Sequence, residues 1–124
     1  MPQVKPRNSM FEMATYENSK TNEIRFLDSS TKSPLCDPTI IPTPILYRLY
    51  YLGRAYDLQG LKRFRPDQRN MLGFVDSQQI CSELEFLNTV VTDPLVRAFS
   101  DEIESKLVSV RGNTNSRLQT IPPQ

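Results

Sequence analysis

Histidine is absent from this chain of 124 residues, and its absence excludes several kinds of chemistry. Histidine is the usual general base near neutral pH and the commonest metal ligand in proteins. A Ser-His-Asp triad, a Cys-His pair and an HExxH zinc site are therefore all excluded. A mechanism built on carboxylates or lysine alone stays open, but no pattern points to one. We therefore expect no catalytic residues, no metal site and no cofactor.

Cysteine and glycine are also scarce. The two cysteines, Cys36 and Cys81, are far apart and form no CxxC pattern, so we expect two reduced thiols rather than a disulfide framework, with a single bridge between them as the alternative. The four glycines stand alone in the sequence, and no Walker, Rossmann or EF-hand pattern can be drawn through them. Nothing in the sequence therefore indicates a nucleotide or calcium site.

Long apolar runs are missing as well. No stretch of 18 or more apolar residues occurs, which predicts that the chain has no transmembrane helix. The first ten residues, MPQVKPRNSM, contain two prolines and no apolar h-region, so they do not look like a secretory signal. We expect a cytoplasmic protein without a membrane partner.

The length fits one domain, which we place at residues 10–111. Residues 1–9 and 112–124 are polar and contain prolines, so we expect both to be disordered tails.

The start of the domain has the pattern of a β-hairpin. Residues 11–16 and 24–27 are short runs that alternate and are rich in aromatic and branched side chains, and the polar stretch ENSKTN separates them. Residues 29–44 contain four prolines, which favour an extended connector over a helix or a central strand.

Three amphipathic helices should follow. The first begins at Pro44 with Thr43 as its N-cap and should end near residue 59 before Gly60. Helical spacing places four of its side chains on one buried face: Ile45, Leu49, Leu52 and Tyr56. Gly53 falls on its inner face and would allow a close crossing with another element. Residues 61–74 are harder to assign; we expect a short helical turn at 67–71 and core anchors at Phe64, Met71, Leu72 and Phe74.

The second helix should start after Asp76, with Gln79 completing a capping box, and should bury Ile80, Leu84, Leu87 and Val91, with Phe86 and Val90 widening that stripe. Asp93 and Pro94 then begin a third helix that Gly112 ends. The predicted fold is α+β: an N-terminal β-hairpin packed on about three helices, the last two forming an antiparallel αα-hairpin.

Charge is segregated along the chain, although the net charge is only +1. Residues 44–70 contain six basic and two acidic side chains, whereas residues 76–106 contain two basic and seven acidic ones. The acidic helices would repel DNA phosphates, which argues against a helix-turn-helix protein. Two surfaces could bind a partner. The acidic surface consists of Glu83, Glu85, Asp101, Glu102 and Glu104. The Tyr/Arg surface consists of Tyr47, Tyr51, Arg48 and Arg54. The competing interpretation is that these groups cap helices, cover the hairpin or pair with one another.

The leading functional hypothesis is a non-catalytic protein–protein interaction module. Its concrete form would be an inhibitor or immunity-type protein that neutralises a basic toxin or other enzyme through a charged helical face. The alternative is a small nucleic-acid-binding or regulatory protein that uses the segment 47–69, in which tyrosines and basic residues could stack bases and hold phosphates, namely Tyr47, Arg48, Tyr51, Arg54, Lys62, Arg63, Arg65 and Arg69. The oligomeric state is left open.

Overall fold

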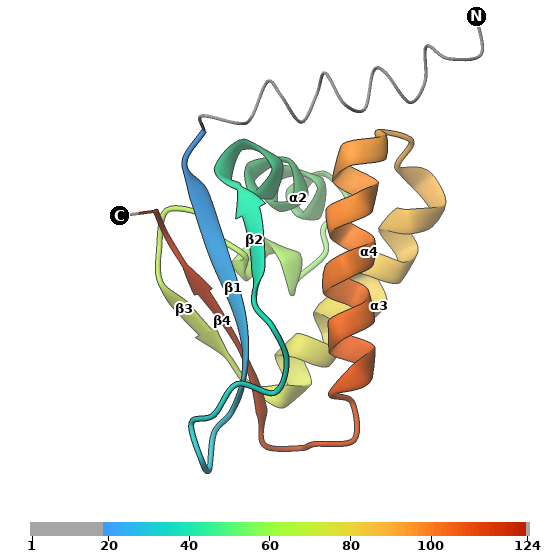
Figure 1. Ribbon diagram of the computed structural model, residues 1–124. Coiled ribbons are helices and arrows are strands. Elements are labelled where there is room, and N and C mark those ends of the chain that lie inside the picture. Colours follow the sequence, from blue (N-terminus) through green and yellow to red (C-terminus); the bar gives the residue numbers. More distant parts are fainter. Residues whose placement is uncertain (1–18, 124) are drawn as a thin grey trace, which may run out of the picture.

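The computed structural model describes residues 19–123, which form an antiparallel four-stranded sheet with three α-helices against one face (Figure 1). This arrangement confirms the α+β class. In chain order the elements are β1 (Thr21–Asp28), β2 (Thr39–Pro42), α2 (Thr43–Ala55), the short 3-10 helix η1 (Leu61–Arg63), β3 (Asn70–Leu72), α3 (Phe74–Val90), α4 (Pro94–Ser109) and β4 (Ser116–Ile121).

Strand β4 lies inside the sheet, which has the order β2-β1-β4-β3. The prediction that residues 112–124 form a disordered tail was therefore wrong for this strand. Along β4, Leu118 points into the core between Phe26 of β1 and Leu72 of β3, while Arg117 and Gln119 point to the other face. The strand looks polar in the sequence because two of its inward residues are Ser116 and Thr120, which are buried but carry hydroxyl groups.

Strand β1 confirms the strand predicted at residues 24–27, but its partners differ from the prediction. It pairs with β4 along one edge and with β2 and the loop before it along the other, where the N–H of Leu35 donates to the carbonyl of Phe26 at 2.7 Å. The N-terminal antiparallel pair of the described structure is thus β1–β2. The other predicted hairpin arm, residues 11–16, lies outside the described residues.

Strand β2 forms within the proline-rich segment that we expected to be a plain connector. It lies at an edge of the sheet, with β1 as its strand neighbour, and Pro42 is its last residue. An edge position tolerates a residue without a backbone N–H, which explains why the prolines did not prevent a strand.

Helix α2 begins one residue before the predicted start and ends earlier than predicted. Thr43 is its first residue rather than its N-cap, and its hydroxyl donates to Asn22 Oδ1 at 2.7 Å. The helix ends at Ala55 because Asp57 adopts a left-handed conformation with φ of 55°. The N–H groups of Asp57 and Leu58 then return to the carbonyls of Arg54 and Gly53, which is a Schellman motif. Asp57, and not Gly60, therefore supplies the stop.

Gly53 allows the close crossing that we predicted. A Cβ placed on it would lie 2.7 Å from the Cβ of Leu61, so only glycine lets η1 pack directly on α2. The turn of helix expected at residues 67–71 is absent, since β3 begins at Asn70. Of the four predicted anchors, Phe64 and Leu72 are buried, Phe74 is half-buried, and Met71 points away from the core.

The α3–α4 pair confirms the predicted αα-hairpin. Residues 91–93 join the helices, and Asp93 caps α4 by accepting hydrogen bonds from the N–H groups of Leu95 and Val96 at 2.9 and 3.2 Å. Helix α3 begins one residue after Gly73, so Asp76 lies in its first turn and is not its cap. Phe86 and Val90 were wrongly placed in the buried stripe, as each is 41% exposed.

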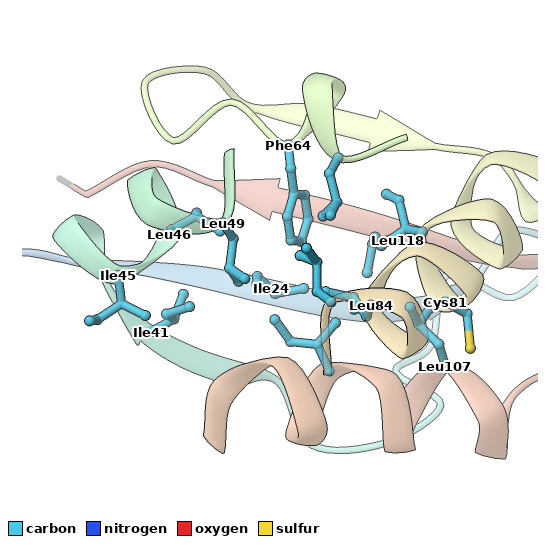
Figure 2. Close-up of a cluster of buried hydrophobic side chains, with 14 of the residues drawn as sticks. Ile24, Ile41, Ile45, Leu46, Leu49, Phe64, Cys81, Leu84, Leu107 and Leu118 are labelled. Carbon is cyan, nitrogen blue, oxygen red and sulfur yellow. The ribbon is translucent and has the colours of Figure 1, made fainter. Parts of the chain in front are cut away.

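The core lies between the sheet and the helices (Figure 2). Figure 2 shows side chains from every layer meeting there: Ile24 and Leu118 from the central strands, Leu49 from α2, Leu84 from α3 and Leu107 from α4. Both cysteines are free thiols, as predicted, and burial raises the pKa of each.

Candidate functional site

Glu83 does not belong to an exposed acidic face. Its side chain is buried, Oε1 accepts a hydrogen bond from the N–H of Leu61 at 2.8 Å, and Oε2 accepts one from the N–H of Gly60 at 3.0 Å. A carboxylate at this position satisfies the free N–H groups at the start of η1 and complements the positive end of that short helix. Glu83 is therefore a structural residue, which corrects its predicted place in a binding surface.

The other four acidic residues do not act as one free patch. Glu102 pairs with Lys106 at 3.1 Å, and Glu104 accepts a hydrogen bond from Asn88 Nδ2 at 2.8 Å. Burial raises the pKa of Glu102, but hydrogen bonds with Thr39 and Lys106 outweigh that effect and hold it below its usual value. Glu85 and Asp101 are exposed and form no ion pair with any residue of 19–123.

Most of the basic segment is also neutralised inside the molecule. Two ion pairs connect it to the acidic helices: Arg48 with Asp93, and Arg63 with Asp76 at 2.8 Å. Two more are local, between Lys62 and Asp57 and between Arg65 and Asp67. Within the part of the chain that the structure describes, Arg54 and Arg69 are exposed and make no ion pair.

A hollow of about 540 Å³ lies between α2 and the α3–α4 connection, and we call it the α2 groove. Helix α2 supplies one wall, and the end of α3, its connection to α4 and the first turn of α4 supply the other. The Arg48–Asp93 ion pair joins the two walls. The lining is mostly apolar and consists of Arg48, Tyr51, Leu52, Ala55, Tyr56, Val90, Val91, Thr92, Asp93 and Val96.

Large apolar side chains are exposed around the α2 groove. Tyr51 is 54% exposed and Tyr56 is 47% exposed, and Val90 stands on the opposite wall. The ring of Tyr56 meets Phe86 edge to face with 5.3 Å between centroids, so the apolar surface continues onto α3. Clustered exposed apolar side chains of this kind mark interaction sites more often than scattered ones do.

A second hollow of about 570 Å³ adjoins the α2 groove at the start of α2, and we call it the N-terminal hollow. It shares Arg48 and Tyr51 with the groove, so these two side chains stand between the hollows. Tyr47 stacks against Tyr51 at 6.0 Å between centroids. The remaining lining comes from Ser19, Lys20, Thr43 and Pro44.

The structure thus brings together part of the predicted site. Tyr47, Arg48 and Tyr51 line one continuous hollowed surface, whereas Arg54 is exposed beside it. Sequence reasoning missed Tyr56 and Val90 because helical spacing placed both on buried faces. Tyr56 lies just beyond the end of α2 at Ala55, and Val90 is the last residue of α3.

The groove offers apolar contact, two tyrosine hydroxyls and one ion pair, which suits binding more than bond-breaking chemistry. Residues 19–123 contain no cluster of three or more side chains able to hold a metal ion. No helix in this range is long and apolar enough to cross a membrane. No protein-family model, curated protein or solved structure matches the chain.

Proposed function

We propose that this protein is a non-catalytic protein-binding module that holds an apolar segment of another protein in the α2 groove. The observation that carries the proposal is the exposure of Tyr51 and Tyr56 beside an apolar hollow. Tyrosine is enriched among the residues that dominate binding energy at interfaces, because it buries a large rigid surface and keeps a polar end. Arg48, held in place by Asp93, adds a second residue type enriched at such centres.

Two basic side chains without an ion-pair partner in residues 19–123 lie beside the hollows. Lys20 lines the N-terminal hollow, and Arg54 lies one helical turn after Tyr51 on α2. Both are exposed and neither forms an ion pair with a residue of 19–123. A partner that fits this site would therefore present apolar or aromatic anchors with acidic side chains beside them.

An inhibitor or immunity-type role remains one concrete form of the proposal, in which the bound segment belongs to a toxin or other enzyme. Docking of a basic enzyme on the acidic helices has less support, because Glu83 is buried and Glu102 and Glu104 have partners within the chain. The nucleic-acid alternative has less support too, since four of its six basic residues already pair with carboxylates.

The test compares two matched double variants in quantitative binding. Tyr51→Ser/Tyr56→Ser removes the anchors, and Ile40→Ser/Met71→Ser removes two apolar side chains of similar exposure, 50% and 53%, from the strands β2 and β3. A protein captured from cells is purified and its affinity for the wild type and both variants is measured. We expect the groove variant to lose at least about tenfold in affinity, as truncation of interface anchors does, and the strand variant to bind like the wild type. Equal losses in both variants, or none in the groove variant, would refute the proposal.

A further inference from the structure

We infer that residues 10–17 of the same chain occupy the α2 groove and the N-terminal hollow, so that an external partner must displace them. This inference rests on the proposed function of the groove. The described chain begins at Ser19, and both Ser19 and Lys20 line the N-terminal hollow. The carbonyl of Lys20 accepts a hydrogen bond from the N–H of Thr43 at 2.9 Å, which fixes this point of the chain at the start of α2.

The strand predicted as the partner of this segment has no free edge. Residues 24–27 of β1 face β4 on one side and β2 with its preceding loop on the other. Residues 24–27 therefore offer no free edge to the segment at residues 11–16, which the sequence pattern had paired with them. Its apolar side chains need another surface, and the hollow that begins at Ser19 is the adjacent one.

The length of the segment matches the site. Eight extended residues span at most about 26 to 29 Å. Helix α2, with 13 residues, is about 20 Å long. A chain that leaves Ser19 can therefore run along the whole of α2, passing first over the N-terminal hollow and then over the α2 groove, which lie on either side of Tyr51.

The chemistry of the segment matches the partner that the site requires. Residues 10–17 read MFEMATYE, with apolar or aromatic side chains at Met10, Phe11, Met13 and Tyr16. Two glutamates, Glu12 and Glu17, accompany them and suit the exposed Lys20 and Arg54. The segment joins the described chain through Asn18 alone, and such a short tether gives an effective concentration in the millimolar range. Weak intrinsic affinity is then enough for occupancy.

The experiment follows backbone amide signals by NMR in three full-length proteins: the wild type, Phe11→Ser/Met13→Ser, and the control Lys5→Ser/Arg7→Ser. We expect the Phe11/Met13 variant to shift the amide signals of residues 47–56 while the control leaves them in place. Unchanged signals in this range, or shifts confined to the sheet, would overturn the inference. If dilution of the wild type tenfold reproduces the shifts, the occupant is a second copy of the chain, which also overturns it.

A synthetic peptide of residues 9–18 provides a second measurement. It should bind the Phe11/Met13 variant at least about tenfold more tightly than the wild type, whose site is already filled by a tethered competitor. Equal affinity for the two proteins would overturn the inference.

Failure of the inference is distinguishable from failure of the proposed function. If the segment does not dock, affinity for an external partner still depends on Tyr51 and Tyr56 and is the same with or without Phe11 and Met13. If the segment docks and regulates, loss of Phe11 and Met13 raises the affinity for an external partner. Adding the Tyr51 and Tyr56 substitutions to that variant then abolishes the gain in affinity.

Discussion

Leu61 donates its backbone N–H to the carboxylate of Glu83 at 2.8 Å, across 22 positions of sequence. The second oxygen of Glu83 accepts the N–H of Gly60, so α3 supplies the cap for η1. This contact attaches the segment between α2 and β3 to α3. It also explains how a carboxylate comes to be buried in a region of the chain that contains an excess of acidic residues.

Loss of this cap should destabilise the fold. Glu83→Ala leaves two buried N–H groups without acceptors, and we expect the free energy of unfolding to fall by about 2–5 kcal/mol. Glu83→Gln keeps the size but retains one acceptor oxygen, so it should cost about 1–3 kcal/mol. Urea unfolding measures both. The control Glu85→Gln, at an exposed position two residues on, should stay within about 0.5 kcal/mol; a comparable loss there would contradict the assignment.

Glycine at position 53 should be required for packing, although glycine usually destabilises the interior of a helix. Alanine ordinarily stabilises a helix interior by about 0.5–1 kcal/mol relative to glycine. At Gly53 the new methyl group would collide with Leu61, so Gly53→Ala should destabilise by about 1–3 kcal/mol. At Gly112 a Cβ meets nothing within 4 Å, and Gly112→Ala should be neutral or stabilising by up to about 1 kcal/mol. Thermal unfolding measures both variants. Relative to the wild type, the shifts in Tm of the two variants should differ in sign or clearly in size.

Asp28 should make stability depend on acid pH. Hydrogen bonds from Ser30 and Asn113 hold the pKa of its carboxyl well below the ordinary range. Because the folded pKa lies below the unfolded one, this carboxylate stabilises the fold above about pH 4 and the contribution is lost as pH falls further. Asn113→Ala removes one donor and should weaken the dependence between about pH 2 and 5.

Unfolding of the wild type and the Asn113→Ala variant in urea, at pH values across that range, measures the dependence. Identical slopes of stability against pH in the two proteins would show that Asn113 does not contribute to the low pKa of Asp28.

Strand β4 should be indispensable. Leu118→Ala removes a fully buried side chain from the middle of the sheet and should cost about 2–5 kcal/mol. Gln119→Ala, whose side chain points to the other face, should cost less than about 0.5 kcal/mol. Deletion of residues 114–124 should leave the protein without a cooperative unfolding transition. Circular dichroism during heating distinguishes these outcomes, and a folded deletion variant would show that the sheet does not need β4.

Local signals predicted the parts of the fold that local contacts determine. Asp93 followed by Pro94 marked the start of α4 correctly because the cap lies within three residues of its donors. The position of Gly53 on the inner face of α2 predicted a close crossing, although not that Leu61 would fill it. The αα-hairpin followed from two amphipathic helices with a short connection.

Contacts between distant residues determined what was missed. Glu83 looked like a surface residue because the N–H groups that it caps lie more than 20 positions earlier. β4 looked like a polar tail because its burial depends on β1 and β3 as neighbours. Of the candidate site, the tyrosines and Arg48 on α2 were found, whereas the wall formed by Val90–Asp93 depends on how α3 and α4 pack beside α2.

The position of β4 also orders the events of folding. During synthesis β1 and β3 emerge long before residues 116–121, and neither can pair with the other directly because β4 lies between them. Until β4 inserts, β1 and β3 each present unpaired backbone groups and apolar residues that invite association with other chains. Completion of the sheet is therefore a late step with a large loop to close, and we expect the nascent protein to depend on rapid insertion of β4 to escape aggregation.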